Sequence, residues 1–286
     1  RPPLPPPDGR RAAARRRLAR RRPRADGRQV GWRERSFGVR AAGRRRRRGR
    51  RPLLFLSRSQ RCERSPLHRV DGSATWCQGA TSVTAAIHGP RATTARGECP
   101  TTATVGAEWA PAGGAPADEH RAFERLIEGA VTGALRGSLL PRTAVSAVVA
   151  VGHDDGATLA AAVNAVSAAM VDAALPLRHT LCAAAVAVDS GGQPAADPTA
   201  AEEAAAASVA TFVFAAFAPE PGAPPALDGD TVVACHVRGR VSDEALLAAE
   251  ALARGAAARV AVFQKAGLVK SLAAAAGEGM TAGAVS

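Results

Sequence analysis

Residues Val70 to Pro90 read VDGSATWCQGATSVTAAIHGP, and this stretch decides how the folded part of the chain begins. Small apolar and β-branched residues alternate there with polar ones, which predicts two short strands, Ala74–Ala80 and Thr81–Ile87. Gly79 supplies the turn between them, and the Gly89-Pro90 dipeptide is expected to end the pairing. The stretch therefore predicts an antiparallel hairpin.

Beyond the hairpin, the apolar pattern changes several times between strand and helix periods. Helical spacing predicts helices at Glu119–Arg136, around Leu159 to Met170, and from Ser242 to about Leu272. Further strands are expected at 101–108, 143–151, 181–188, 209–217 and 230–237, and a short helical turn at 202–207. This order of elements predicts an α+β fold rather than a doubly wound one.

Charge is divided unevenly along the chain. Residues 1–69 hold 25 Arg and 4 acidic residues, whereas the remainder holds 13 Lys and Arg against 21 acidic residues. An Arg-dense stretch broken by Pro and Gly buries too little apolar surface to offset the entropy of ordering it. We therefore expect a disordered arm at 1–64, one folded domain at 65–272 and a frayed tail at 273–286.

The Arg-rich arm allows three interpretations. It could bind nucleic acid by neutralising phosphates. The run Arg44–Arg48 could instead be a nuclear-import or transit signal. The third interpretation is an inert extension, translated from GC-rich sequence upstream of the true start, and it fits a chain that begins at Arg and contains no Tyr.

Two further features narrow the class of protein. No apolar run reaches the roughly 18 to 20 residues that span a bilayer, so a soluble protein is expected. The 5 cysteines are far apart and show no CxxC spacing, which predicts neither a disulfide framework nor a zinc site and favours a reducing compartment. We expect no cofactor.

Several short motifs resemble a known family when their order and spacing are taken together. They are DGSA at Asp71, QGATSV at Gln78, LPRT at Leu140, NAVSAAMVDAALPLR at Asn164 and DPT at Asp197. In this arrangement the chain resembles the RNase PH-like subunits of the eukaryotic RNA exosome, and within them the component 5 group. The resemblance runs from about Pro66 to Leu272.

The resemblance implies a fold and an assembly. The fold is the RNase PH fold, with mixed sheets and packed helices similar to domain 2 of ribosomal protein S5. The implied assembly is a six-membered ring of RNase PH-like subunits with cap subunits, through whose channel RNA passes. A location in the nucleus, including the nucleolus, and in the cytoplasm is expected, with no membrane partner.

The resemblance also indicates a degenerate site. Active relatives hold phosphate with two arginines, one after the Asp-Gly turn that opens the central helix and one near the start of the preceding helix. Here those positions hold Leu159 and Glu119. Two aspartates of active relatives, six residues apart, fall at Glu203 and Val209, and Val cannot ligate a metal. We therefore expect no catalytic residue and no metal, in a pocket without Arg or Lys; His120 is expected to point elsewhere.

The positions of other polar residues in the sequence indicate what roles they have. Arg91 and Arg96 follow the hairpin, where the loop of the family faces the RNA channel, so they are candidate RNA contacts or ordinary solvated arginines. The pair Asp154 and Asp155, before Gly156, is typical of a turn rather than of chemistry. Asn164, on an apolar helix face, is expected to be a buried amide with its hydrogen bonds satisfied.

The sequence thus favours a non-catalytic structural subunit of the exosome core ring, which supports 3′-to-5′ RNA processing and decay. One alternative is a residual phosphorolytic or hydrolytic exoribonuclease. The other is a free homodimer that binds nucleic acid through the arm.

Overall fold

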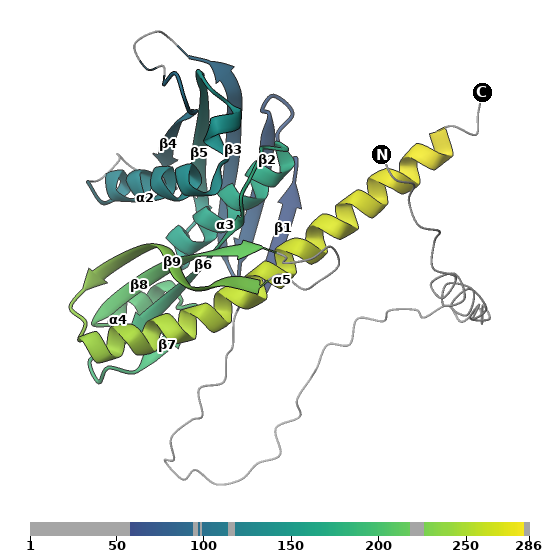
Figure 1. The fold of residues 1–286 in the computed structure, drawn as a ribbon. Coiled ribbons are helices and arrows are strands. Elements are labelled where there is room, and N and C mark those ends of the chain that lie inside the picture. Colours follow the sequence, from purple (N-terminus) through teal and green to yellow (C-terminus); the bar gives the residue numbers. More distant parts are fainter. Residues whose placement is uncertain (1–57, 94–96, 98, 114–117, 218–225, 283–286) are drawn as a thin grey trace, which may run out of the picture. The chain divides into compact units, whose positions relative to one another are not determined.

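The computed structural model describes residues 58–93, 97, 99–113, 118–217 and 226–282 (Figure 1). Side chains are not described at 217, 226, 228–231 and 274–282. Residues 1–57, most of the expected arm, lie outside the described part, as does Arg96.

The first sheet has five strands in the order β1-β2-β3-β5-β4. Their bounds are β1 (Gln60–Arg64), β2 (Gly72–Gln78), β3 (Thr81–Ala92), β4 (Thr104–Ala110) and β5 (Thr143–His153). Strands β4 and β5 pair in parallel and all other neighbours are antiparallel, so the sheet is mixed. The predicted hairpin is confirmed as β2 and β3, with Gly79 in the turn at a φ of +61°.

The pairing of β2 with β3 ends at Ile87, just before Gly89-Pro90, as predicted, but strand β3 itself does not end there. Strand β3 continues to Ala92 and pairs again with β5 after an irregularity between His88 and Arg91. The Gly89 N–H donates to Asp71 Oδ2 at 2.7 Å, so a side chain replaces the lost strand partner there. The dipeptide interrupts the strand instead of terminating it.

The second sheet has four antiparallel strands in the order β7-β6-β8-β9. Their bounds are β6 (Thr180–Val188), β7 (Pro194–Ala196), β8 (Ser208–Phe217) and β9 (Ala226–Gly239). The helices are α2 (Asp118–Ala134), the 3-10 turn η2 (Gly137–Leu139), α3 (Thr158–Asp172), α4 (Ala200–Ala205) and α5 (Asp243–Ala282). This combination confirms the predicted α+β fold.

Helix α3 forms the centre of the core, and it is buried on all sides from Leu159 to Met170. It packs against β2 and β3 of the first sheet and against β6 of the second. Close packing requires a glycine at Gly72, because a Cβ there would lie 2.4 Å from the backbone nitrogen of Ala173. The glycine of the DGSA motif therefore lets the first sheet approach the helix.

Polar residues of α3 complete the hydrogen bonding of β6 where no strand lies beside it. Asn164 donates to the Ala183 carbonyl at 3.0 Å and accepts from the Ala183 N–H at 2.8 Å. Ser167 accepts from the Leu181 N–H at 3.0 Å. The expectation that Asn164 is a satisfied buried amide is confirmed, and its partner is a strand edge.

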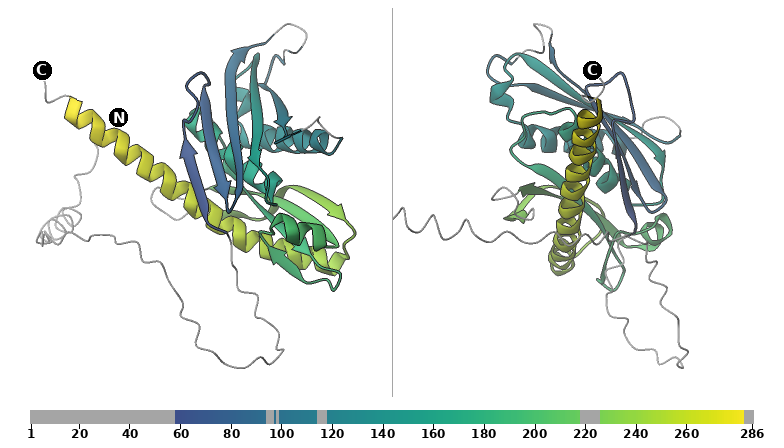
Figure 2. Two further views of the ribbon diagram at one scale, coloured as in Figure 1. Left: turned by 180° about the vertical axis from the view of Figure 1, so that it is seen from behind. Right: turned by 90° about the vertical axis from the view of Figure 1, so that its right-hand side faces the viewer.

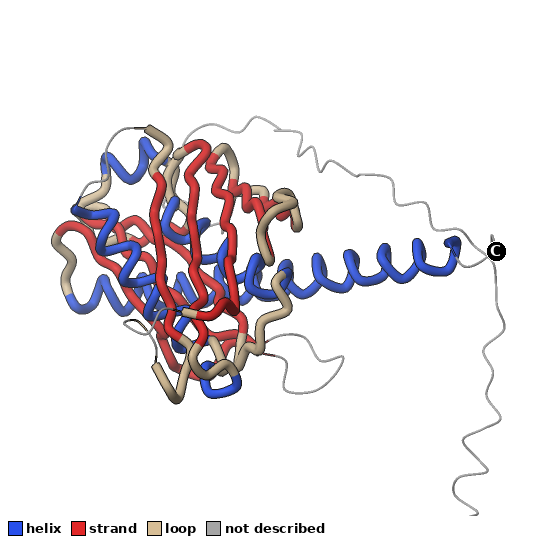
Figure 3. Tube along the Cα trace, turned by 90° about the horizontal axis from the view of Figure 1, so that it is seen from above, coloured by secondary structure: helices blue, strands red, loops and turns tan. Residues whose placement is uncertain are grey.

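Helix α5 covers the second sheet with its first half and extends past the strands with its second half (Figures 2 and 3). It continues to Ala282, beyond the end expected near Leu272, because the Ala-rich sequence after that residue still favours a helix. Phe263 packs edge-on against Trp76 of β2, with ring centroids 5.4 Å apart. None of the described helices is both long and apolar enough to cross a membrane.

Strand β1 corrects the boundary of the arm. Residues 60–64 pair antiparallel with β2, from Gln60 opposite Gln78 to Arg64 opposite Ala74. The expected boundary at residue 65 is therefore too late, because charged residues can form an edge strand when alternate side chains face solvent. The ordered part begins no later than Arg58.

Candidate functional site

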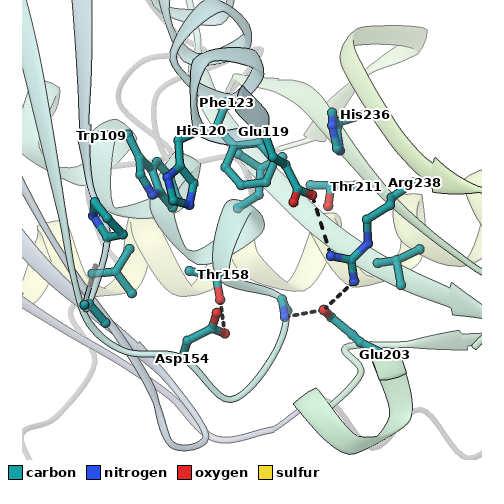
Figure 4. Close-up of a pocket in the computed structure, with 17 residues that line it drawn as sticks. Trp109, Glu119, His120, Phe123, Asp154, Thr158, Glu203, Thr211, His236 and Arg238 are labelled. Carbon is teal, nitrogen blue, oxygen red and sulfur yellow. Dashed lines mark hydrogen bonds and ion pairs between the residues drawn. The ribbon is translucent and has the colours of Figure 1, made fainter. Parts of the chain in front are cut away.

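A pocket of about 320 Å³ lies at the N-terminus of α3 (Figure 4). Its walls come from the start of α2, the end of β4, the turn before α3, helix α4, and strands β8 and β9. The four positions singled out from the family resemblance, Glu119, Leu159, Glu203 and Val209, all line it. Residues far apart in sequence are thus brought together as the resemblance implied.

Leu159 lies in the first turn of α3 and is 5% exposed. Its side chain belongs to the hydrophobic core as well as to the pocket wall. A leucine here offers no hydrogen-bond donor to an anion, and its burial explains why the position is apolar.

Glu203 places a carboxylate at the N-terminus of α3. Its Oε1 accepts a hydrogen bond of 2.6 Å from the N–H of Ala157, which precedes the helix with a φ of 55°. The capping box of α4, formed by Thr199 and Glu202, fixes the short helix that carries it. Burial raises the pKa of Glu203, while the Ala157 hydrogen bond and nearby Arg238 oppose that rise.

Arg238 also lines the pocket, so the expectation of a pocket without Arg or Lys is wrong. Its guanidinium lies between two carboxylates, 3.6 Å from Glu119 Oε1 and 3.8 Å from Glu203 Oε2 (Figure 4). Strand β9 positions it, because Arg238 lies opposite Val209 in the register with β8. His236 lies opposite Thr211 two residues earlier, so the strand period places both on the pocket side.

Aromatic side chains form one wall of the pocket. Trp109 contacts Phe123 with ring centroids 5.1 Å apart, and His120 stacks on Trp109 at 6.1 Å. Phe123 packs edge-on against His236 at 5.2 Å. His120 therefore faces the pocket, contrary to expectation, whereas Arg121 pairs with Asp118 at 3.6 Å. No sequence pattern indicates this wall, because it depends on how α2 packs beside β4 and β9.

The Asp154–Gly156 segment is a turn, as predicted. Asp154 Oδ1 accepts from the Gly156 N–H at 3.0 Å and from the Thr158 hydroxyl. Gly156 has a φ of +84°, and a Cβ there would lie 2.6 Å from the Pro198 carbonyl oxygen. The turn thus packs directly against the DPT segment.

A buried polar network behind the pocket explains the QGATSV and DPT motifs. The Arg58 guanidinium donates to Asp197 Oδ1 at 2.9 Å and to the Asp155 carbonyl at 2.6 Å. Gln78 donates to the same Asp197 oxygen at 2.5 Å, and Thr81 donates to the Gly156 carbonyl at 2.8 Å. Arg58, assigned to a disordered arm from the sequence, therefore fixes the base of the site.

Arg91 and Arg96 are the two candidate RNA-contacting arginines. Arg91 lies near the end of β3, not in a loop, and its guanidinium contacts Asp71 Oδ2 at 3.2 Å. The Gly89 hydrogen bond and Arg91 lower the pKa of Asp71. The role of Arg91 in RNA binding remains a prediction, and Arg96 lies outside the described residues.

The donor set does not fit the divalent metal of active relatives. Glu203 already accepts from Ala157 and faces Arg238, and Val209 offers no ligand atom. Within the described ranges, no group of three or more His, Cys, Asp or Glu residues could hold a metal ion. All five cysteines are free thiols.

Comparison with known proteins places the chain in a family. The profile of the 3′ exoribonuclease family, domain 1, called RNase PH, matches residues 57–176. The Exosome complex component RRP46 homolog of Caenorhabditis elegans is 30% identical over 155 residues, which make up 54% of this chain and 71% of the relative. The chain belongs to the RNase PH family.

Other relatives agree with this RNase PH assignment. The Exosome complex exonuclease RRP46 homologs of Arabidopsis thaliana and Oryza sativa subsp. japonica are each 35% identical over 153 residues, 54% of this chain. The match spans only 64% of the length of these two plant relatives.

Solved structures resemble the RNase PH domain described above. The crystal structure of rice Rrp46 has a TM-score of 0.66 at 30% identity and covers 76% of this chain and 96% of the rice chain. An Archaeoglobus fulgidus exosome with RNA bound to its active site has a TM-score of 0.58 at 18% identity, covering 71% of this chain and 87% of that one. The archaeal likeness supports the fold alone.

Proposed function

We propose that this chain is a non-catalytic structural subunit of an RNA exosome core ring, where it supports 3′-to-5′ RNA processing and decay by nucleases elsewhere in the complex. The observation that carries the proposal is the charge of the pocket at α3. Glu119 and Glu203 both line this pocket, and both carboxylates lie near the guanidinium of Arg238. Arg238 is the sole Arg or Lys among the described residues that line the pocket.

Phosphorolysis needs cationic groups that hold phosphate and stabilise charge in the transition state. In this pocket the helix N-terminus, which favours anions, already has the Glu203 carboxylate on the Ala157 N–H. An incoming phosphate would meet two carboxylates and a guanidinium that is already paired. These features support the loss of phosphorolysis.

The proposed partners are other RNase PH-like subunits in a six-membered ring, the cap subunits, and RNA. The names of the relatives as exosome components support this assembly. A nuclear, nucleolar and cytoplasmic location is part of the same proposal, as is membership of the component 5 group. The expected result is that tagged full-length protein co-purifies with RNase PH-like and cap subunits; recovery only as a monomer or homodimer would contradict ring membership.

The catalytic part of the proposal is tested separately. Purified protein is incubated with single-stranded RNA, inorganic phosphate and Mg²⁺, and released nucleoside diphosphates are measured by chromatography. We expect none above the level of a no-protein control. Release that a Glu203→Gln change abolishes would show an active site.

A residual exoribonuclease is the second candidate, because the plant relatives carry the name exonuclease and Arg238 provides one cation in the pocket. Arg238→Ala distinguishes the two candidates. Loss of measurable RNA turnover in this variant, with turnover retained in Arg125→Ala on the exposed side of α2, would favour the enzyme.

A further inference from the structure

A second cavity, of about 360 Å³, shares no residue with the pocket at α3. It lies between the second half of α3, the segment at 177–180 and the middle of α5. Val171, Leu177 and Leu268 contribute large apolar side chains to its wall. Such a cavity can receive one apolar side chain from outside.

The apolar surface continues along α5 beyond the cavity. Val269 is 58% exposed and Leu272 is 61% exposed. At 100° per residue, these two side chains project from the same side of the helix as Lys265 and Leu268, and both of those residues line the cavity. Cavity and helix therefore form one surface, which we call the α5 groove: the cavity residues together with Val269 and Leu272.

The charge of the α5 groove has one sign. Arg64, Arg178 and Lys265 line it, and no acidic residue does so among the described residues. Arg64 is held there by hydrogen bonds to the Gln264 carbonyl at 3.2 Å and the Ser271 hydroxyl at 3.1 Å. Along α5, residues 255–273 include Arg259, Lys265 and Lys270 and no acidic residue.

This positive charge argues against two occupants of the groove, the N-terminal arm of the chain and a second copy of the chain. The N-terminal arm is Arg-rich, so it would be repelled by the cations of the groove. A second copy that offered the same surface would bring the same cations face to face. The complementary occupant is a segment with an apolar anchor and acidic flanks.

We propose that the α5 groove docks such a segment from a neighbouring subunit of the assembly: an apolar side chain enters the cavity, and Asp or Glu residues beside it pair with Arg64, Arg178 and Lys265. The inference rests on the proposed ring membership. The apolar contact supplies most of the affinity, since buried anchors dominate interfaces, while the charges at the rim set the partner and the association rate.

In the test, the full chain is mixed with purified RNase PH-like and cap subunits of the same organism, and assembly of the ring is measured. Val269→Glu and Arg178→Glu place acid on the groove at exposed positions, so the fold of the chain should be preserved. Leu247→Glu, at an apolar residue of α5 that is 69% exposed, and Arg125→Glu on α2 are the matched controls. We expect each groove variant to weaken association at least tenfold and each control to change it less than twofold.

The outcomes separate the two proposals. Failure of the wild-type chain to assemble would overturn ring membership and this inference with it. Assembly of both groove variants with wild-type affinity would overturn the inference alone. As a second readout, a photoreactive residue in place of Val269 should cross-link to a segment rich in Asp or Glu, and a cross-link to a segment without them would also overturn it.

Discussion

Glu203 shows how one carboxylate changes what a helix terminus can do. The N-terminus of α3 carries unpaired N–H groups and a partial positive charge, which together suit an anion. Glu203 supplies that anion from within the chain, on the Ala157 N–H, and its other oxygen faces Arg238. An external anion at this terminus would therefore have to displace a carboxylate that belongs to the chain itself.

The raised pKa of Glu203 gives a prediction about pH. A carboxyl whose pKa is higher in the folded state than its unfolded value of 4.5 binds protons more tightly when folded. Stability from this group therefore falls as pH rises from 4.5 through the folded pKa, and stays lower above it. Glu203→Gln keeps an oxygen for the Ala157 N–H but cannot ionise. We expect the midpoint of thermal unfolding of the variant, relative to wild type, to improve as pH rises from 4.5 to 8.

The control for this pH series is Glu128→Gln, at an exposed position of α2. Its unfolding midpoint should follow the wild-type pH profile in parallel. If the Glu203→Gln profile were also parallel to wild type, Glu203 would not be the group that responds to burial.

Between elements, the site depends on close approaches that side chains would prevent. The turn before α3 touches the segment before α4 at Gly156, and β2 touches the end of α3 at Gly72. Arg58 joins the turn before α3 to the segment before α4, because it donates to the Gly156 carbonyl and to Asp197. Gln78 of β2 donates to the same Asp197 carboxylate. The family motifs thus act as packing and hydrogen-bonding contacts, which can persist when the chemistry is lost.

Gly156→Ala should strongly destabilise the domain. The new Cβ would lie 2.6 Å from the Pro198 carbonyl oxygen, and the φ of +84° disfavours any side chain. We expect a loss of more than about 2 kcal/mol in unfolding free energy, measured by urea denaturation. Gly133→Ala on α2 is the matched control, because a Cβ there meets nothing within 4 Å and alanine favours a helix by about 1 kcal/mol. A neutral Gly156→Ala would mean that the turn can move away from the Pro198 segment.

Two truncations distinguish the contribution of the arm to stability from that of strand β1. Removing residues 1–57 should leave the unfolding midpoint unchanged, since this Arg-dense sequence offers little apolar surface to bury. Removing residues 1–64 also deletes β1 and leaves Asp197 buried without its arginine, at a cost of about 3 kcal/mol or more. That corresponds to a fall of roughly 6 °C or more in the midpoint of a domain of this size. Equal midpoints for the two truncations would show that β1 contributes nothing.

Over the whole molecule, the secondary structure could be predicted wherever the apolar residues of a segment followed one spacing, that of a strand or that of a helix. The hairpin at Gly79 and helix α3 followed from alternation and helical spacing. Strand β1 was missed because the Arg-rich composition around it masks a five-residue edge strand. The pairing of Arg238 could not be foreseen, because it depends on the register between β8 and β9 and on the position of α2. The local spacing of apolar residues predicts helices and strands, whereas the charge of a pocket depends on how those helices and strands pack together.

The uneven charge of the whole molecule leads to a prediction about RNA binding. Residues 1–57 hold 21 Arg and 3 acidic residues, whereas residues 58–286 hold 17 Lys and Arg against 22 acidic residues. Full-length protein should bind single-stranded RNA with an affinity that falls steeply with salt, because each neutralised phosphate releases counterions. Removal of residues 1–57 should weaken binding at least 100-fold at low salt and flatten the salt dependence, measured by fluorescence anisotropy. Replacing Arg44–Arg48 with Lys, which keeps the charge, should preserve both. A truncated chain that kept the full slope would instead place the RNA contacts on the folded domain, with Arg91 the first residue to test.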